Sequence, residues 1–325
     1  MRNPILASFC LCLLMIADTA SAEGKPLRIG TLPFGTLNWE LSVIRDEGLD
    51  KAHGLALETT PLASAEAGRI ALQGGGVDLI VSDWIWVAQQ RGQGFDFTFV
   101  PYSTSHGALV VPAGSPIRGI PDLAGKRLGI AGGGLDKNWL LLRALAQKAH
   151  RLDLDRVVEK TFGAPPLLNQ QLQQGRLDAV LDYWNYAAKL EALGYRRLLD
   201  GHGILSGLGI QAEVPALGYV FREAWAKANR PLLTGFLRAG EQAKRAICES
   251  ETTWRKVSPL TQEPDEKTRQ SLRQYYCAGR VTRFGAAEQR AAQEILALLK
   301  ATAGEAAALP AALPEGVFWP AGAAP

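Results

Sequence analysis

ALQGGGVDLIVSDW at residues 71–84 and QLQQGRLDAVLDYW at residues 171–184 are two versions of one pattern. In each, Leu-Gln-x-Gly-x-x-Asp leads into a short apolar run that ends close before a tryptophan. An Asn-Trp pair also recurs, at residues 38–39 and 138–139, with the same offset of 100 residues. Matches at one shared offset indicate duplication rather than chance, so the sequence predicts two related structural units.

Strand-like and helix-like segments alternate around both stretches, which is the pattern of a parallel sheet covered by helices. Proline and glycine residues between 112 and 121 interrupt the alternation, and a second series follows them. The expected strands are residues 27–32, 55–60, 77–81, 95–100, 108–111, 127–131 and 179–182. The expected helices are residues 39–51, 65–72 and 135–150. The sequence therefore predicts an α/β protein with two Rossmann-like lobes.

The N-terminus has the features of a secretory signal peptide. Arg2 precedes an apolar run over residues 5–17, and Ala20-Ser21-Ala22 supplies small residues where a signal peptidase cuts. The run is short for a membrane span. We therefore expect residues 1–22 to be removed and the mature protein to be free in the compartment to which it is exported. A lipid anchor is the weaker alternative, because the two cysteines of this region lie inside the apolar run and not directly after it.

Composition and charge exclude several function classes. The formal net charge is only +3 over 325 residues and the basic residues are scattered, so the footprint of a nucleic-acid-binding protein is missing. The four histidines are isolated from one another, which argues against a zinc site. Cys248 and Cys277 are the only cysteines left after processing. In an oxidising compartment they favour a disulfide, worth about 3 kcal/mol from loop closure, over two buried thiols.

A ligand cleft is expected where the two units face each other. In open parallel sheets, ligands bind outside the carboxyl ends of the strands, among loops and helix starts. Both Asn-Trp pairs and both tryptophan-ending stretches fall at such positions. The residues that we expect to contact a small solute there are Thr36, Asn38, Trp39, Ser82, Asp83, Trp84, Ser105, His106, Gly133, Gly134, Asp136, Asn138, Trp139, Asp182, Tyr183, Trp184 and Asn185.

The charge of the solute depends on which of these groups are free. Asp83 and Asp182, beside several tryptophans, favour an amine or an aminopyrimidine-like ring through ion pairing and cation–π contact. The glycines at 132–134, placed before a helix, could instead bind an anion through free N–H groups. Lys137 is the only basic residue in these loops and arginine is absent from them, so a sulfonate or nitrate is the less favoured solute.

Several of these residues also have an ordinary structural role open to them. Trp39 and Trp139 could belong to the core, Asn38 could cap a helix, and Asp136 could satisfy a helix dipole. The segment 103–106 carries three hydroxyls and an imidazole, but neighbouring residues on a strand point to opposite faces. We therefore expect hinge or ligand contacts from this segment rather than catalysis.

Four stretches carry a resemblance to a known family. They are LRIG at 27–30, ALQGGGVD at 71–78, VVPAGSPI at 110–117 running into DLAGKR at 122–127, and QQGRLDAV at 173–180. In these stretches the chain resembles the nitrate/sulfonate/taurine and thiamine-precursor group of periplasmic solute-binding proteins. The third stretch is the most specific, and the likeness weakens after about Arg222.

The resemblance implies the type II periplasmic-binding-protein fold, in which two lobes are joined by a two-segment hinge and hold the ligand between them. The hinge is expected near residues 106–112 and 209–215. The expected division is residues 23–108 and 214–300 for lobe 1, residues 109–213 for lobe 2, and residues 301–325 for a loose tail. The helices up to residue 300 are expected to pack on lobe 1.

The resemblance also implies a function. A solute held in the cleft would be delivered to an ABC permease and its ATPase by a monomeric protein, without a cofactor and without chemistry on the solute. A ligand-sensing domain that reports to a membrane partner is one alternative with the same architecture. A second alternative is an enzyme that makes a thiamine pyrimidine, but such relatives use a cysteine-rich motif that the mature chain lacks.

Overall fold

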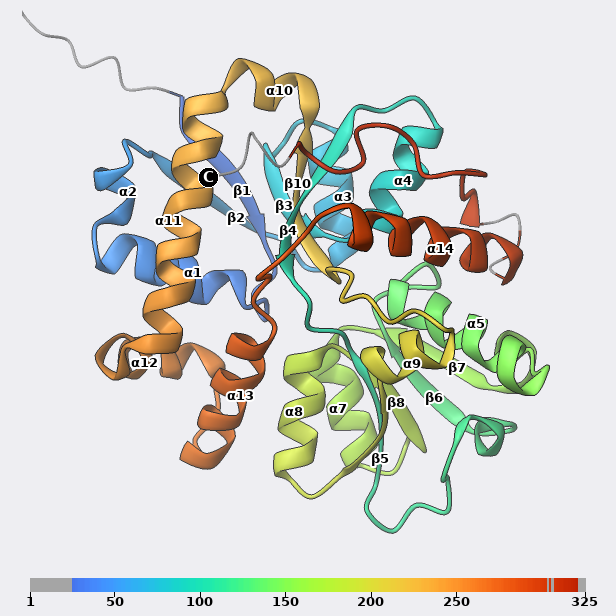
Figure 1. Ribbon diagram of the computed structural model, residues 1–325. Coiled ribbons are helices and arrows are strands. Elements are labelled where there is room, and N and C mark those ends of the chain that lie inside the picture. Colours follow the sequence, from blue (N-terminus) through green and yellow to red (C-terminus); the bar gives the residue numbers. More distant parts are fainter. Residues whose placement is uncertain (1–24, 303, 305–306, 321–325) are drawn as a thin grey trace, which may run out of the picture.

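The computed structural model describes residues 25–302, 304 and 307–320. The expected signal peptide, residues 1–22, lies outside these described residues. Within them the chain forms two five-stranded sheets with flanking helices, arranged as two lobes (Figure 1). No helix in this part of the chain is both long enough and apolar enough to span a bilayer. The fold is the two-lobed α/β arrangement that the sequence predicts.

The first sheet has the strand order β2-β1-β3-β10-β4. Its strands are β1 (Leu27–Thr31), β2 (Leu57–Pro61), β3 (Leu79–Ser82), β4 (Phe97–Ser103) and β10 (Leu217–Arg222). The helices of this lobe include α1 (Leu37–Asp46), α2 (Leu49–Ala52), α3 (Ala65–Gln73), α4 (Trp84–Gly92) and α10 (Glu223–Ala228). Leu27, Ile29 and Leu79 are fully buried, as expected of inner strands covered on both faces.

The second sheet has the strand order β7-β6-β8-β5-β9. Its strands are β5 (Ala108–Val111), β6 (Arg127–Ala131), β7 (Glu159–Gly163), β8 (Ala179–Asp182) and β9 (Arg196–Asp200). The helices of this lobe are η1 (Ile120–Leu123), α5 (Lys137–His150), α6 (Leu154–Val157), α7 (Pro165–Gln173), α8 (Trp184–Ala192) and α9 (Gly201–Gly207). Strands β6, β7 and β8, with α7 between β7 and β8, repeat the arrangement of β1, β2 and β3, with α3 between β2 and β3.

Both sheets are mixed rather than wholly parallel. β10 pairs antiparallel with β3 and β4, and β5 pairs antiparallel with β8 and β9. Each of these two strands directly follows a passage of the chain from one lobe to the other. Strands β7 and β9 were not predicted, because every residue in them is at least partly exposed and neither contains a continuous apolar run. Gly48, with φ at +68°, divides the expected helix 39–51 into α1 and α2.

The duplicated Leu-Gln-x-Gly-x-x-Asp pattern is a structural clamp. The Arg28 guanidinium lies 2.6 Å from the Asp78 carboxylate and 2.9 Å from the Gly75 carbonyl, and the Arg28 backbone N–H also donates to Asp78. Arg127 makes the same contacts with Asp178 and with the matching glycine of the second lobe. Both glycines have positive φ, +71° and +70°, which glycine adopts without strain. The repeat therefore fastens the turn after α3 to the start of β1, and the turn after α7 to the start of β6.

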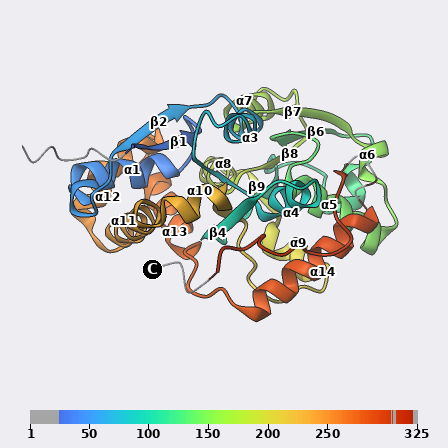
Figure 2. The same cartoon turned by 90° about the horizontal axis from the view of Figure 1, so that it is seen from above.

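The C-terminal helices spread over both lobes. α11 (Arg230–Glu249), α12 (Glu251–Val257), η2 (Ser258–Thr261) and α13 (Glu266–Ala278) follow the first lobe, and α11 lies along α1. We expected the last helix on the first lobe as well, but α14 (Ala286–Thr302) packs against α5 of the second lobe (Figures 1 and 2). Its buried residues Ile295, Leu296 and Leu299 join the same core as Leu140 and Leu141 of α5. An amphipathic pattern predicts that a helix packs, but not which surface it covers.

Residues 307–320 are not the loose tail that we expected. The Phe99 N–H of β4 donates to the Val317 carbonyl at 2.8 Å, and the Trp319 N–H donates back to the Phe99 carbonyl at 2.9 Å. Val317 and Trp319 are buried, and the Phe318 ring packs beside Phe99 and Trp84. The tail therefore lies along the edge of the first sheet. Its alanine and proline content concealed these apolar anchors.

A buried ion pair joins four elements of the first lobe. Glu40 of α1 is fully buried, and its carboxylate lies 2.8 Å from the Lys244 ammonium of α11. The hydroxyls of Tyr219 in β10 and Tyr276 in α13 donate to the same carboxylate at 2.9 and 2.6 Å. Lys244 also lies 3.6 Å from the centre of the Tyr102 ring in β4. Burial raises the pKa of Tyr219 and Tyr276, and the Glu40 charge raises it further, so both hydroxyls remain protonated donors.

Removing only the cation of this pair should destabilise the protein strongly. Lys244→Met leaves the Glu40 carboxylate buried without a countercharge, and we expect a loss of about 3–5 kcal/mol in the free energy of unfolding. The double variant Glu40→Gln/Lys244→Met should lose less, because no uncompensated charge remains. Urea denaturation of a chain of residues 23–325 measures both losses. A single variant as stable as the double variant would contradict the assigned role.

His106 lies behind the cleft, at the first crossing between the lobes. It is 9% exposed, and its ring packs edge-on against His202 with ring centres 5.5 Å apart. Burial, followed by the nearby positive charge of Lys137, lowers the pKa of His106 to about 3. The Asp200 carboxylate opposes this shift only in part. His106 is therefore a neutral core residue at neutral pH.

Acid should destabilise the protein through His106. The unfolded histidine binds a proton near its ordinary pKa of about 6.5 while the folded one does so only near 3, so stability falls as pH drops from 6.5 towards 3. Between pH 7 and pH 5 this loss is about 2 kcal/mol. His106→Gln should remove that part of the pH dependence in urea denaturation, whereas His150→Gln, at an exposed position, should not. Equal pH profiles for wild type and His106→Gln would refute the assignment.

Candidate functional site

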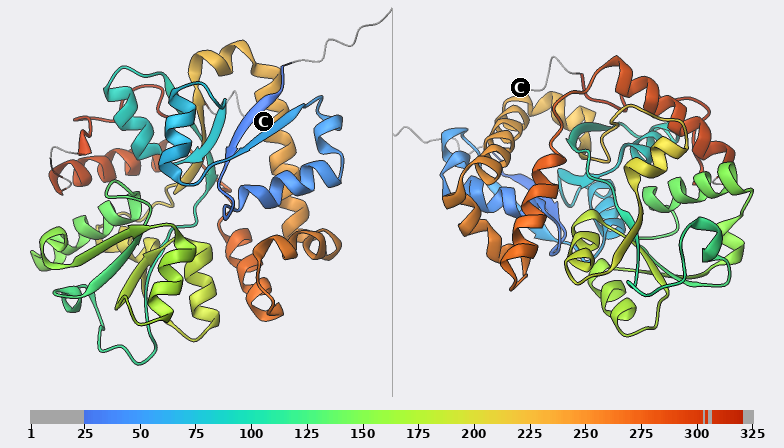
Figure 3. Two further views of the ribbon diagram at one scale, coloured as in Figure 1. Left: turned by 180° about the vertical axis from the view of Figure 1, so that it is seen from behind. Right: turned by 60° about the horizontal axis from the view of Figure 1, so that its bottom comes forward.

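Loops from both lobes enclose a cleft at the carboxyl ends of the strands. An inner cavity of about 120 Å³ is lined by residues that follow β1 and β3 in the first lobe and β6 and β8 in the second. An outer cavity of about 470 Å³ adjoins it. The lining residues shared by the two cavities are Phe34, Ala65, Arg69, Asp136 and Tyr183. The lining residues of the cleft thus come from both lobes, whose arrangement is seen from two further directions in Figure 3.

The structure brings most of the predicted solute contacts to this cleft. Those that line the inner cavity are Thr36, Ser82, Asp83, Ser105, Asp136, Asn138, Tyr183, Trp184 and Asn185. Gly133 and Gly134 line the outer cavity. The predicted residues that line neither cavity are Asn38, Trp39, Trp84, His106, Trp139 and Asp182. The position of the cleft follows from the rule that ligands bind at the carboxyl ends of the strands, which we call the strand-end rule. This rule does not predict which side chains at those ends point into the cleft.

Three of the four predicted tryptophans belong to the core. Trp139 is 1% exposed, and Trp84 packs beside Phe318 of the tail. Trp39 lies edge-on against Trp184, with ring centres 6.3 Å apart, and it also contacts residues of the C-terminal helices. Burying an indole removes a large apolar area from water, which is favourable. A tryptophan in the first turn of a helix therefore packs towards the sheet when the core has room for its ring. Only Trp184 remains as a cleft residue.

Asn38 and Asp182 are engaged within their own loops. The Asn38 amide donates to the carbonyls of Leu32 and Gly35 at 2.7 and 3.0 Å, which closes the loop before α1. Asp182 is fully buried and accepts the Tyr183 N–H at 2.8 Å. Burial raises the pKa of Asp182 well above its ordinary value. Neither side chain offers the solute a free charge.

Arg69 is the functional candidate that the sequence reasoning missed. It comes from the middle of α3 and not from a strand-end loop, yet it lines both cavities. Its guanidinium lies 2.7 Å from the Asp83 carboxylate and 3.3 Å from the Ser82 hydroxyl. Asp83 in addition accepts the Trp86 N–H at 2.8 Å as the cap of α4. The carboxylate that favoured a cationic solute is therefore already paired with a cation, and the cleft does contain an arginine.

Lys137 is a buried cation in the inner cavity. It is the first residue of α5 and is only 7% exposed. Among the described residues its ammonium group makes no ion pair or hydrogen bond, although its charge interacts with that of the neighbouring Asp136 carboxylate. Asp136 beside it caps α5 by accepting the Asn138 N–H at 2.8 Å, and burial raises the pKa of Asp136. Lys137 and the start of α5 therefore place positive charge at this end of the cavity, beside the Asp136 carboxylate.

Aromatic side chains form the other walls of the inner cavity. Phe34, Tyr102, Tyr183 and Trp184 line it, and they come from both lobes. Burial raises the pKa of Tyr183 strongly, so its hydroxyl stays a neutral donor. The Asn185 amide donates across the lobes to the Phe34 carbonyl at 3.4 Å. The cavity thus combines a localised positive charge with flat apolar surfaces.

Comparisons with known proteins agree with this architecture. The chain matches the model of the NMT1/THI5-like family over residues 43–251. It is similar to the alkanesulfonate-binding protein SsuA from Xanthomonas axonopodis pv. citri bound to MOPS, with 19% identity, a TM-score of 0.71, and 90% of this chain and 98% of that chain covered. It is also similar to the periplasmic aliphatic sulphonate binding protein SsuA from Escherichia coli, with 21% identity, a TM-score of 0.64, and 86% and 85% covered.

A third similar structure is the periplasmic nitrate-binding protein NrtA from Synechocystis PCC 6803, with 11% identity, a TM-score of 0.56, and 74% of this chain and 66% of that chain covered. A search of curated proteins gave no significant match. At these identities the structural neighbours establish the fold alone. The two mixed sheets around one cleft form the type II periplasmic-binding-protein fold, and the chain belongs to the NMT1/THI5-like family.

Proposed function

We propose that this chain is the solute-binding component of an ABC importer in the periplasm, and that its solute is a small organic molecule with an anionic group. The observation that carries the proposal is Lys137. The Lys137 ammonium makes no ion pair or hydrogen bond among the described residues, and an anionic group in the inner cavity would supply a close partner for its charge. The inner cavity places this ammonium among side chains from both lobes.

The walls of the cavity support an organic solute over a bare inorganic ion. Phe34, Tyr183 and Trp184 supply flat apolar surface, which would be wasted on an ion such as nitrate. The inner cavity of about 120 Å³ is small, so a larger solute would extend into the adjoining outer cavity. Three proteins of similar fold are named as binders of alkanesulfonates, aliphatic sulphonates and nitrate. These ligands are anions, as is the solute that we propose for this chain.

We also propose that the protein binds its solute without altering it chemically. Ser105 lines the inner cavity, but His106 lies behind it, so this hydroxyl and imidazole do not face one solute together. The Ser105 hydroxyl donates to the Tyr275 carbonyl instead, at 3.4 Å. We therefore propose that closure of the lobes removes the solute from water and that the closed protein delivers it unchanged to the permease.

An amine or aminopyrimidine remains the second candidate solute, because Asp83 and Asp136 also line the inner cavity. Its support is weaker than the sequence indicated. Asp83 is held by Arg69 at 2.7 Å, and Asp136 is engaged as the cap of α5, where it accepts the Asn138 N–H at 2.8 Å. A cation entering the cavity would also approach Lys137.

Ligand-dependent stabilisation of the mature chain tests the proposal. The protein is unfolded, freed of bound solute and refolded, and then screened with size-matched sulfonates, carboxylates, amines and aminopyrimidines. Binding to the folded state must raise the melting temperature, and we expect sulfonates or carboxylates to do so. Lys137→Met should weaken the binding of such an anion by about 2–3 kcal/mol, which is roughly a hundredfold, in calorimetric titration.

Lys51→Met is the matched control, because Lys51 is an exposed lysine of α2 that lines neither cavity. It should bind the anion as the wild type does. Stabilisation by amines alone would exchange the proposed solute for the second candidate. Stabilisation by an anion with equal affinity for wild type and Lys137→Met would show that Lys137 is not the receiving group.

A further inference from the structure

A segment outside the cleft connects the two lobes. It comprises η2, the loop at residues 262–265 and α13, and we call residues 258–278 the bracket. The C-terminal part of α13 is fastened to the first lobe. Cys277 forms a disulfide with Cys248 of α11, and the Tyr276 hydroxyl binds the buried Glu40 carboxylate at 2.6 Å. Arg273 adds a hydrogen bond to the Ile247 carbonyl at 2.9 Å.

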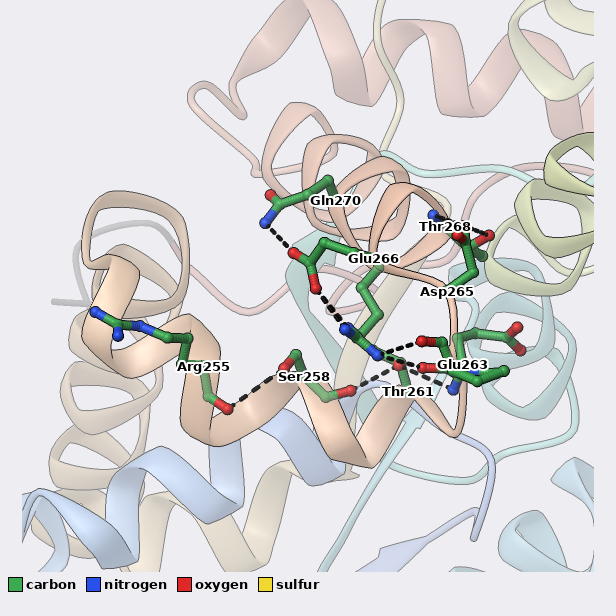
Figure 4. A network of polar contacts seen from close by, with 10 residues as sticks. Arg255, Ser258, Thr261, Glu263, Asp265, Glu266, Thr268 and Gln270 are labelled. Carbon is green, nitrogen blue, oxygen red and sulfur yellow. Dashed lines mark hydrogen bonds and ion pairs between the residues drawn. The ribbon is translucent and has the colours of Figure 1, made fainter.

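The bracket is internally cross-linked, as Figure 4 shows. The Thr261 hydroxyl donates to the Ser258 carbonyl at 2.6 Å. Asp265 caps α13 by accepting from both the N–H and the hydroxyl of Thr268 at 2.7 Å. The Arg269 guanidinium donates to two successive loop carbonyls at 2.8 and 2.9 Å. These bonds span every part of the loop, so the bracket can transmit a constraint from one end to the other.

The opposite face of the bracket holds α8 of the second lobe. α8 and α13 pack side by side, and the Lys189 ammonium of α8 lies 2.8 Å from both the Glu263 carboxylate and the Thr261 carbonyl. The Tyr275 hydroxyl of α13 donates to Glu191 at 3.1 Å. The Lys189 and Glu263 side chains are 14% and 22% exposed, so their attraction is less screened than that of a surface pair.

The helix that the bracket holds carries a wall of the cleft. α8 begins with Trp184 and Asn185, which line the inner cavity. The Trp184 ring lies against Trp39 of the first lobe, and Asn185 binds the Phe34 carbonyl. A shift of α8 would therefore move Trp184 and Asn185, which both line the inner cavity.

We infer that the bracket is a positioning element for the cleft: anchored by the Cys248–Cys277 disulfide, it holds α8 and thereby sets the place of Trp184 and Asn185. The effect on the solute rests on the proposed function, whereas the effect on α8 does not. Lys189 and Glu263 are the positioning residues at the contact. The duplicated helix α4 (Trp84–Gly92) occupies the matching place in the first lobe and supplies an internal reference.

Hydrogen–deuterium exchange of the ligand-free mature chain tests the inference. Lys189→Met removes the two contacts of Lys189 with the bracket and keeps the Tyr275–Glu191 hydrogen bond and the disulfide. Lys267→Met is the matched control at an exposed position of α13. We expect exchange in α8 to become about fivefold faster in Lys189→Met, with α4 unchanged and with no change in Lys267→Met. Reduction of the disulfide with dithiothreitol should accelerate exchange in α13 and α8 together.

Two results would overturn the inference. One is an unchanged exchange rate for α8 in Lys189→Met. The other is faster exchange of α13 after reduction while α8 keeps its protection. If reduction unfolds the whole protein, α4 loses protection as well, and the disulfide-containing Lys189→Met variant then decides.

Affinity separates this inference from the proposed function. For an anion that stabilises the wild type, Lys189→Met should raise the dissociation constant roughly fivefold, although Lys189 does not line either cavity, and Lys267→Met should leave it unchanged. A wild type that binds none of the screened solutes counts against the proposed function, and the exchange rates still decide the role of the bracket. Equal affinities together with faster exchange in α8 would contradict its role in the cleft.

Discussion

The buried ion pair between Glu40 and Lys244 is the interaction on which the arrangement of the cleft depends. Two charges removed from water are tolerated only if their partners stay in place, so the pair fixes α1, β10, α11 and α13 relative to one another. α1 begins directly after Thr36, a residue of the inner cavity. α13 carries the bracket towards the second lobe. The Glu40 carboxylate thus links α1, which follows the cleft residue Thr36 of the first lobe, to the bracket, which contacts α8 of the second lobe.

Lys137 and Lys244 are both buried, but they differ in whether the protein itself pairs their charge. Lys244 is surrounded by a carboxylate and a tyrosine hydroxyl and by aromatic faces, so its charge is satisfied by the fold. Lys137 is as deeply buried but meets no such partner among the described residues, and it faces a cavity. A charge that the fold satisfies is structural, whereas a charge that the fold leaves exposed to a cavity is available to a ligand. This contrast is the physical basis for an anionic solute.

Sequence reasoning located the fold and the cleft but not the chemistry inside the cleft. The duplicated stretches and the alternation of strands and helices were sufficient for two α/β lobes, and the strand-end rule led to Thr36, Ser82 and Asp136. It failed for Trp39 and Trp139, because helical position does not say which side of a helix start faces the core. It missed Arg69, which reaches the cleft from within a helix. The packing of α14, the tail and the bracket depends on long-range contacts that no local pattern encodes.

A crystal structure of residues 23–325 with the solute bound, at neutral pH, tests the central claim most directly. The proposal predicts density for one organic solute in the inner cavity, with an anionic group within hydrogen-bond distance of the Lys137 ammonium and an apolar part against Trp184 or Phe34. A solute that contacts Asp83 or Asp136 through a cationic group and leaves Lys137 without a partner would contradict it, as would a solute bound outside the cleft.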